Sequence, residues 1–335
     1  MYHQLILLAG IALLLIAGGS LHADEIDGYH YVGTINHTLS IQASLHFTND
    51  DVSGKYRYDS QVSELNLIGK LNNNHTIAMD EYSGGNYYLI GTKTGMFTWV
   101  ISTDHQSITG TWHNVDRKRR FPFMLTAMAE YRKMSNQVVC PGSDKSDPDS
   151  VYYIKEIFPV FLHPTPLLAK LNQSNQKYAM KDFVVAIHDA KHPVEGNYSS
   201  AGNQISITYV GSNFISFSIL RLAGSGHSFV SYITKNYLLT GKTPHPITLD
   251  ELFVTDSHTR KVLLQHIRKQ ASALAESEDF DEKITLSNIP FTLTPAGVTF
   301  IYPREAGNFG GYFVAIPFAK MKDMLNPQSQ LSAVA

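Results

Sequence analysis

Residues 28–47 read GYHYVGTINHTLSIQASLHF, and this stretch decides the fold class. Apolar and polar side chains alternate along it, so that Tyr29 and Tyr31, for example, fall on the same side of an extended chain. A period of two is typical of a β-strand with one buried face. We therefore predict strands over residues 29–35 and 38–47.

The alternating pattern continues to residue 126. Turn-forming runs punctuate it at Asn49-Asp50-Asp51, Asn72-Asn73-Asn74 and Gly84-Gly85. Strands spaced about 8 to 12 residues apart are typical of sandwiches and barrels. Further strands are expected over residues 54–58, 64–71, 76–82, 87–91, 96–101, 107–112 and 121–126. We predict an antiparallel β meander that forms a small barrel or sandwich over residues 24–126.

A change of pattern separates this β-rich part from the rest. Alternation stops after residue 126, and residues 141–148 read PGSDKSDP, which is a linker composition. We predict a linker over residues 127–150. A second domain, of α+β class with helices on one face of a sheet, is then expected over residues 151–326, and a tail over residues 327–335.

The second domain combines helical and stranded segments. Thr165 followed by Pro166 predicts the start of an amphipathic helix, because Pro suits the first helical position. The spacing of Thr248 and Glu251 matches a capping box. A second helix is expected over residues 257–276, and strands over residues 204–210, 213–222, 228–239, 289–293, 298–302 and 312–316.

The first residues of the chain favour export. Residues 5–19 are uncharged and apolar, which matches a signal-peptide core and is shorter than a membrane-spanning helix. Ala23 offers a small residue for cleavage before Asp24. An uncleaved anchor is the alternative. We predict that residues 1–23 are a signal peptide and that the mature chain is periplasmic or secreted, without a transmembrane helix.

Charge and cysteine content exclude several classes. The chain holds 27 Lys and Arg against 29 Asp and Glu, so it has no general cationic field for a phosphate backbone. Nucleic acid is therefore not an expected partner. Cys140 is the only cysteine, which excludes an intramolecular disulfide and a CxxC zinc site. Folding must rest on hydrophobic burial.

No metal-binding pattern is complete. His188 and His192 have the i,i+4 spacing of two zinc ligands, but the glutamate of HExxH is missing and Pro193 follows. The acidic residues 276–282 lack the central glycine and the ligand alternation of an EF-hand loop. We expect neither a metal nor another cofactor, and a catalytic role is not supported by any motif.

Short motifs of the second half occur in a characteristic order. They are YYIKEIFP (152–159), NYLLTGK (236–242), ITLDELF (247–253), FTLTPAGV (291–298) and VAIPF (314–318). Together they resemble the RsiV-like extracytoplasmic domain, through which an anti-sigma factor senses lysozyme. The resemblance covers about residues 150–326. It implies a rigid α+β domain that binds a protein or a glycan at the bacterial cell envelope.

This resemblance leads to the main functional hypothesis. We predict an exported, non-catalytic binding protein that recognises a lysozyme-like protein or a peptidoglycan-derived ligand through its C-terminal domain. The family's usual G-G-A-H-G turn corresponds here to residues 224–228, GSGHS. The expected binding residues are therefore Ser225, Gly226 and His227, together with Asn236 and Tyr237. The alternative is that His227 only satisfies backbone groups of its turn.

Two other functions stay open. An envelope hydrolase could use carboxylates such as Asp250 and Glu251, although a role in capping a helix explains both. The β-rich domain could instead be a lipocalin-like cup for a small apolar ligand, lined by Tyr31, Phe97 and Trp99. A filled core suits a barrel of this size equally well.

Overall fold

The structure is a computed structural model that describes residues 22–86, 89–139, 151–191, 202–225, 227–274, 285–303 and 311–329. The predicted signal segment at residues 5–19 lies outside these ranges. Within them, no helix has both the length and the apolar character that crossing a bilayer requires.

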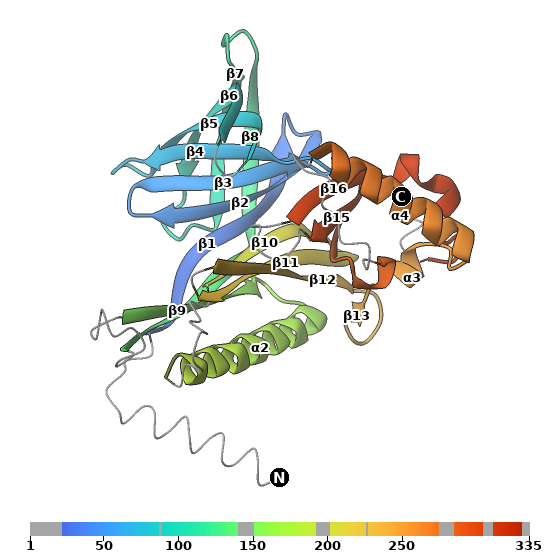
Figure 1. The fold of residues 1–335 in the computed structure, drawn as a ribbon. Coiled ribbons are helices and arrows are strands. Elements are labelled where there is room, and N and C mark those ends of the chain that lie inside the picture. The colour runs from blue at the N-terminus through green and yellow to red at the C-terminus, as the bar shows by residue number, and fades with distance from the viewer. Residues whose placement is uncertain are drawn as a thin grey trace.

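The first eight strands form a closed antiparallel barrel (Figure 1). Each strand pairs with the next, and β8 pairs with β1 to close the ring. The predicted barrel is therefore confirmed, and the segments expected at residues 87–91 and 96–101 contribute to one strand, β6. The strands are β1 (His22–Ile35), β2 (Leu39–Thr48), β3 (Asp51–Tyr58), β4 (Leu65–Leu71), β5 (Thr76–Asn86), β6 (Leu89–Ile101), β7 (Ser107–Asn114) and β8 (Arg120–Val139).

Side chains fill the barrel interior. Tyr31, Phe97 and Trp99 are buried in one core cluster, and not arranged around a cup. The ring of Phe97 lies 5.6 Å from that of Trp99 and 5.2 Å from that of Phe123, both edge to face. This geometry is favourable for aromatic pairs. The filled core, which an eight-stranded barrel is wide enough to hold, is the arrangement that these residues adopt.

Strand β8 continues beyond the barrel into a second sheet. Its first part pairs with β7, and residues 129–139 pair with β9 (Val151–Phe161). The linker predicted over residues 127–150 is therefore wrong for residues 127–139, and residues 140–150 lie outside the described ranges. Ala129, Glu130 and Tyr131 are all buried because the strand is covered on both faces. Such a strand shows no alternation in its sequence.

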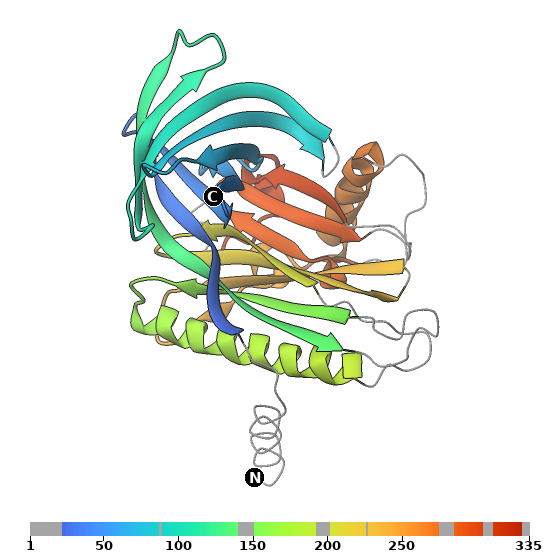
Figure 2. The same cartoon turned by 90° about the vertical axis from the view of Figure 1, so that its left-hand side faces the viewer.

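The second sheet is covered on one face by a long helix. After β9 it consists of β10 (Gly202–Val210), β11 (Phe214–Ser225), β12 (His227–Leu238) and β13 (His245–Pro246). Helix α2 (Pro166–Lys191) lies along the outer face of this sheet (Figure 2). Its predicted start is confirmed, since the Leu168 amide donates to Thr165 Oγ1 at 3.3 Å. Leu171 and Phe183 of the helix pack in the core below it.

A third layer is a small sheet of β14 (Phe291–Thr294), β15 (Gly297–Pro303) and β16 (Gly311–Pro317). It packs on the face of the second sheet opposite to α2, and α4 (Ser257–Leu274) covers its other side (Figures 1 and 2). The predicted α+β architecture is confirmed. The short α3 (Leu249–Leu252) begins with the expected capping box, in which the Thr248 amide donates to Glu251 Oε2 at 2.9 Å. Three single 3₁₀ turns complete the order: η1 (Leu286–Asn288), η2 (Phe318–Lys320) and η3 (Lys322–Met324).

Closure of the barrel between β1 and β8 requires a glycine at position 33. A Cβ atom there would lie 1.9 Å from the Met124 carbonyl oxygen and 2.8 Å from Leu125 Cα. We expect Gly33→Ala to force the strands apart and lower the free energy of unfolding by about 1–3 kcal/mol. Urea unfolding checks this, with Ser107→Ala on the exposed start of β7 as the control. Equal stability of the two variants would contradict the close approach.

Candidate functional site

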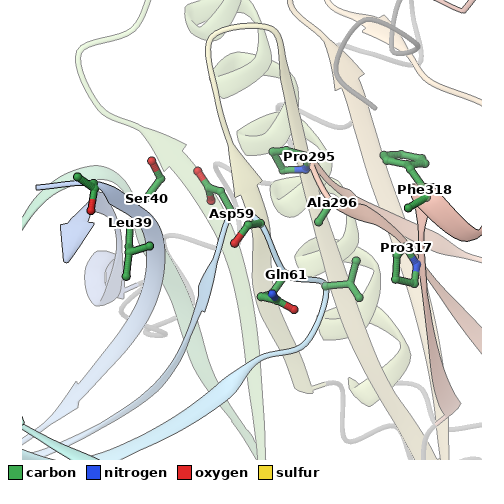
Figure 3. Close-up of a pocket in the computed structure, with 12 residues that line it drawn as sticks. Leu39, Ser40, Asp59, Gln61, Pro295, Ala296, Pro317 and Phe318 are labelled. Carbon is green, nitrogen blue, oxygen red and sulfur yellow. The ribbon is translucent and has the colours of Figure 1, made fainter. Parts of the chain in front are cut away.

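A cleft lies where the barrel meets the small sheet (Figure 3). Its volume is about 580 Å³. One wall comes from the start of β2 and the loop between β3 and β4, and the other from the β14–β15 turn and the end of β16. The lining residues are Thr38, Leu39, Ser40, Asp59, Ser60, Gln61, Val62, Pro295, Ala296, Pro317, Phe318 and Ala319.

Backbone hydrogen bonds hold each wall in place. The Asp59 amide donates to the Ser40 carbonyl oxygen at 2.9 Å, which joins the β3–β4 loop to β2. On the other wall, the Phe318 amide donates to the Ala296 carbonyl oxygen at 2.9 Å. Both walls of the cleft are therefore fixed by their own strands, as the position of a preformed ligand site requires.

The two walls also touch each other. A Cβ atom on Gly297 would lie 2.8 Å from Val62 Cγ1 across the base of the cleft and 2.3 Å from the Ile316 carbonyl oxygen. Only glycine lets the β14–β15 turn approach the barrel this closely. The close approach of the two walls thus depends on a residue without a side chain.

Ionisable groups lie beneath the polar wall. The Arg57 side chain is 4% exposed, and its Nη1 is 3.6 Å from Glu64 Oε1. Lys55 and Arg57 hold the pKa of Glu64 below its usual value, against the opposing effect of burial. Burial raises the pKa of Asp59, and Arg57 opposes that rise. Asp59 Oδ1 and Arg57 Nε are both buried and make no hydrogen bond within the described part of the chain.

Next to this group, a glutamine joins the barrel to the second sheet. Gln42 Oε1 accepts from the Val210 amide at 2.8 Å, and Gln42 Nε2 donates to the Val210 carbonyl oxygen at 3.2 Å. His30 Nε2 bonds to the same Oε1 at 2.9 Å, and His30 Nδ1 is 2.9 Å from Ser44 Oγ. Burial lowers the pKa of His30 to about 3, so this ring is neutral in the folded protein.

Of the five predicted binding residues, the structure describes the side chains of two, Asn236 and Tyr237. Gly226 lies outside the described residues, and the same holds for the side chains of Ser225 and His227, which end β11 and begin β12. Asn236 and Tyr237 follow each other in β12 and therefore face opposite sides of the sheet. None of these residues lines the cleft. Their part in binding stays a prediction.

Asn236 has a structural role that its position on the sheet explains. It is buried beneath the small sheet, and its Nδ2 donates to the Phe291 carbonyl oxygen at 2.8 Å. Its Oδ1 accepts from Ser216 Oγ at 2.7 Å, and Ser216 Oγ accepts from the Leu293 amide at 2.8 Å. Side chains of the second sheet thereby satisfy the backbone of β14. Tyr237 packs instead into the core under α2.

The other candidate groups also lie away from the cleft. Asp250 Oδ1 accepts from Arg260 at 2.6 Å, and Glu251 is held by His245 at 2.6 Å and by the capping box. His188 is exposed and His192 lies outside the described residues. Within the described ranges, no three His, Cys, Asp or Glu side chains gather as metal ligands.

Sequence reasoning missed the cleft because its walls are turns. Asp59, Ser60 and Gln61 read as a strand connection, and so do Pro295 and Ala296. The sequences of these two turns give no signal that the turns, which are more than 230 positions apart in the chain, line one cavity. The only available signal was that loops carry function more often than strands do.

Comparison with known proteins adds little to this geometry. No protein-family model and no curated protein matches the chain. Among solved structures, the chain is similar to a DUF3298 family member from Bacteroides fragilis, with a TM-score of 0.37 and 15% sequence identity, over 62% of this chain and 97% of that one. This likeness is too distant to assign a family or a function.

We call the hydrogen bonds of Asn236 to the Phe291 carbonyl oxygen and to Ser216 the Asn236 clamp. This clamp leads to a stability prediction. Asn236→Ala leaves the Phe291 carbonyl oxygen and the Ser216 hydroxyl without their partner, and each unsatisfied buried group costs about 1–3 kcal/mol. We expect the free energy of unfolding to fall by about 2–4 kcal/mol. Tyr237→Phe, one residue along the strand, is the control and is expected to change stability little. Denaturant unfolding measures both variants. An Asn236→Ala variant as stable as the wild type would show that the Asn236 clamp does not stabilise the fold.

His30 leads to a prediction about pH. Because its folded pKa of about 3 is below the ordinary 6.5, the unfolded chain binds a proton that the folded protein excludes. Its contribution is complete above pH 6.5 and is lost as the pH falls towards 3, at about 1.4 kcal/mol per pH unit. We expect His30→Gln to reduce the pH slope of the unfolding free energy by one proton. His37→Gln, in an exposed turn, is the control; a slope unchanged by His30→Gln would show that this ring does not stay neutral.

Proposed function

We propose that the protein is an exported, non-catalytic binding protein of the bacterial cell envelope that recognises a peptidoglycan-derived ligand in the cleft. The cleft is the observation that carries the proposal. Its volume of about 580 Å³ lies within the range of small-molecule sites, about 300–1,000 Å³. Export rests on the apolar residues 5–19 and on the resemblance of residues 150–326 to an envelope-sensing domain.

The lining suits the saccharide part of a peptidoglycan fragment. The barrel wall presents the hydroxyl groups of Ser40 and Ser60 and the amide of Gln61, which can both donate and accept hydrogen bonds. The opposite wall presents carbon atoms of Pro295 and Pro317. A saccharide with N-acetyl groups has hydroxyl and amide groups along its edge and C–H groups on its faces. Such a ligand would complement both walls; Figure 3 draws the side chains that line them.

A second candidate is a lysozyme-like protein bound by the C-terminal part. The two motifs that carry the resemblance most specifically, residues 236–242 and 247–253, meet in space. The Ile247 amide donates to the Asn236 carbonyl oxygen at 2.8 Å, and β13 pairs with β12 between them. The two neighbouring segments expose Lys242, Thr248 and Asp250, which a protein partner could contact.

Calorimetry with the intact mature chain tests the proposal. A disaccharide–peptide fragment of peptidoglycan is titrated into the wild type, Ser60→Trp and Ser63→Trp. Ser60 lines the cleft, while Ser63 is equally exposed in the same loop and does not. We expect saturable binding that Ser60→Trp weakens at least tenfold, because an indole fills the cleft, and that Ser63→Trp leaves unchanged.

A parallel titration with purified lysozyme separates the two candidates. Binding of lysozyme that is insensitive to Ser60→Trp, with no response to the glycan, would favour the second candidate. If neither ligand binds the wild type, both candidates are wrong. Release of labelled products from peptidoglycan by the purified protein would overturn the non-catalytic role.

A further inference from the structure

We propose that the barrel holds a second binding site, centred on Glu81, for a ligand that carries a primary ammonium group on an apolar stem. This site is separate from the cleft, since none of its residues belongs to the cleft lining. It also takes a ligand of different charge, so it goes beyond the function proposed above.

The first observation is a carboxylate inside the barrel. Ile77, Met79 and Glu81 alternate along β5 and share its inward face, and Glu81 is only 3% exposed. Ile77 and Met79 belong to the apolar core of the barrel. Glu81 thus takes the next inward position beyond that core, where an apolar residue is expected.

Three neutral donors surround this carboxylate. Tyr56 Oη and Trp112 Nε1 donate to Glu81 Oε2 at 2.5 and 2.7 Å. Thr94 Oγ1 donates to Oε1 at 2.5 Å. An ionised carboxylate has about four acceptor positions, so one is left on Oε1 for a further donor. An indole N–H can only donate, which fixes Oε2 as an acceptor.

The second observation is that no basic side chain of the described residues pairs with this carboxylate. Among the described residues, no Lys, Arg or His side chain forms an ion pair with Glu81, and Lys93 pairs with Asp80 at 2.7 Å instead. Buried carboxylates are normally paired with a cation, because removing a lone charge from water is costly.

The third observation is a group of aromatic rings around the two aromatic donors, and some of these rings are partly exposed. Tyr58 meets Tyr56 edge to face at 5.7 Å, and Trp112 stacks on Phe121 at 5.8 Å. Tyr58, Trp112 and Phe121 are half-buried, in contrast to Glu81. Trp112 pairs with Phe121 close to the turn that joins β7 to β8, and Tyr58 is the last residue of β3.

The indole position is itself a constrained feature. A Cβ atom on Gly95 would lie 2.6 Å from Trp112 Nε1, so the glycine lets the indole N–H reach Glu81. An inward position of the barrel, a glycine and three hydrogen-bond donors therefore all serve to orient one carboxylate. A purely apolar filling of the same end would need none of them.

These features specify the ligand chemistry. The free acceptor position on Oε1 calls for an N–H donor, and the missing counter-charge calls for a cation, which together indicate a primary ammonium group. Faces of aromatic rings attract cations and pack against alkyl chains. A quaternary ammonium ion satisfies the charge but offers no N–H group, so it is expected to bind more weakly.

Fluorescence of the intact protein, together with its thermal unfolding, tests this site. The chain has two tryptophans, and Trp112 donates directly to Glu81. The probe is n-butylammonium chloride, compared with choline chloride and with sodium chloride at equal ionic strength. We expect saturable quenching and a raised melting temperature with n-butylammonium, an effect at least tenfold weaker with choline, and none with sodium.

Two substitutions distinguish a specific role of the Glu81 carboxylate from a general effect of negative charge on ligand binding. Glu81→Gln removes the charge. Its amide oxygen can accept from Tyr56 and Trp112, and its NH2 group can donate to the Thr94 hydroxyl, which also accepts. We expect this variant to fold and to lose the n-butylammonium response. Asp80→Asn, the outward neighbour that pairs with Lys93, is expected to keep it. An unresponsive wild type, or a Glu81→Gln variant that responds like the wild type, overturns the site. Glycan binding in the cleft is expected to be unchanged in Glu81→Gln, so the two proposals can fail independently.

Discussion

Strand β8 forms backbone hydrogen bonds in two sheets, and the arrangement of the whole molecule depends on this sharing. Its early residues close the barrel with β7 and β1, and its later residues pair with β9. Backbone groups of a buried strand must all be paired, so the second sheet cannot turn freely relative to the barrel. The outer barrel surface near β1 and β2 is consequently pressed against the end of β10.

That contact explains why polar residues are buried on the outside of the barrel. The Gln42 side chain bonds to both the amide and the carbonyl oxygen of Val210, as a neighbouring strand would. His30 bonds to the same Gln42 oxygen. The arrangement is neutral, so it avoids the cost of burying a charge. A second contact near the start of β1 is ionic: the hydrogen bond from His46, helped by Lys155, lowers the pKa of Asp27 to about 2. The two contacts fix the angle between the barrel and the second sheet from different sides.

Local patterns predicted most elements, because their signals depend on neighbours in sequence. Tyr31 marked an inward barrel position, and Thr165 with Pro166 marked the first turn of α2. The extension of β8 was missed because Glu130 and its neighbours are buried on both faces, which removes the alternation. The cleft and the Asn236 clamp could not be predicted, since both depend on residues that only the tertiary fold brings together. Asn236 lies 55 positions from Phe291, and nothing in either segment specifies that contact.

Asp27, which is half-buried, and the buried Arg57 and Glu81 show how differently this fold treats charge. Asp27 has Lys155 and His46 beside it, and Arg57 has Glu64, so each charge is opposed within the chain. Glu81 is as deeply buried as Arg57, yet only neutral groups donate to it among the described residues. Hydrogen bonds from neutral donors stabilise a carboxylate but do not cancel its charge. If the fold alone determined this position, a glutamine could accept from Tyr56 and Trp112 through its oxygen and donate to the Thr94 hydroxyl, without the cost of burying a charge. The carboxylate is therefore better explained by a positive group from outside the chain than by the packing of the barrel.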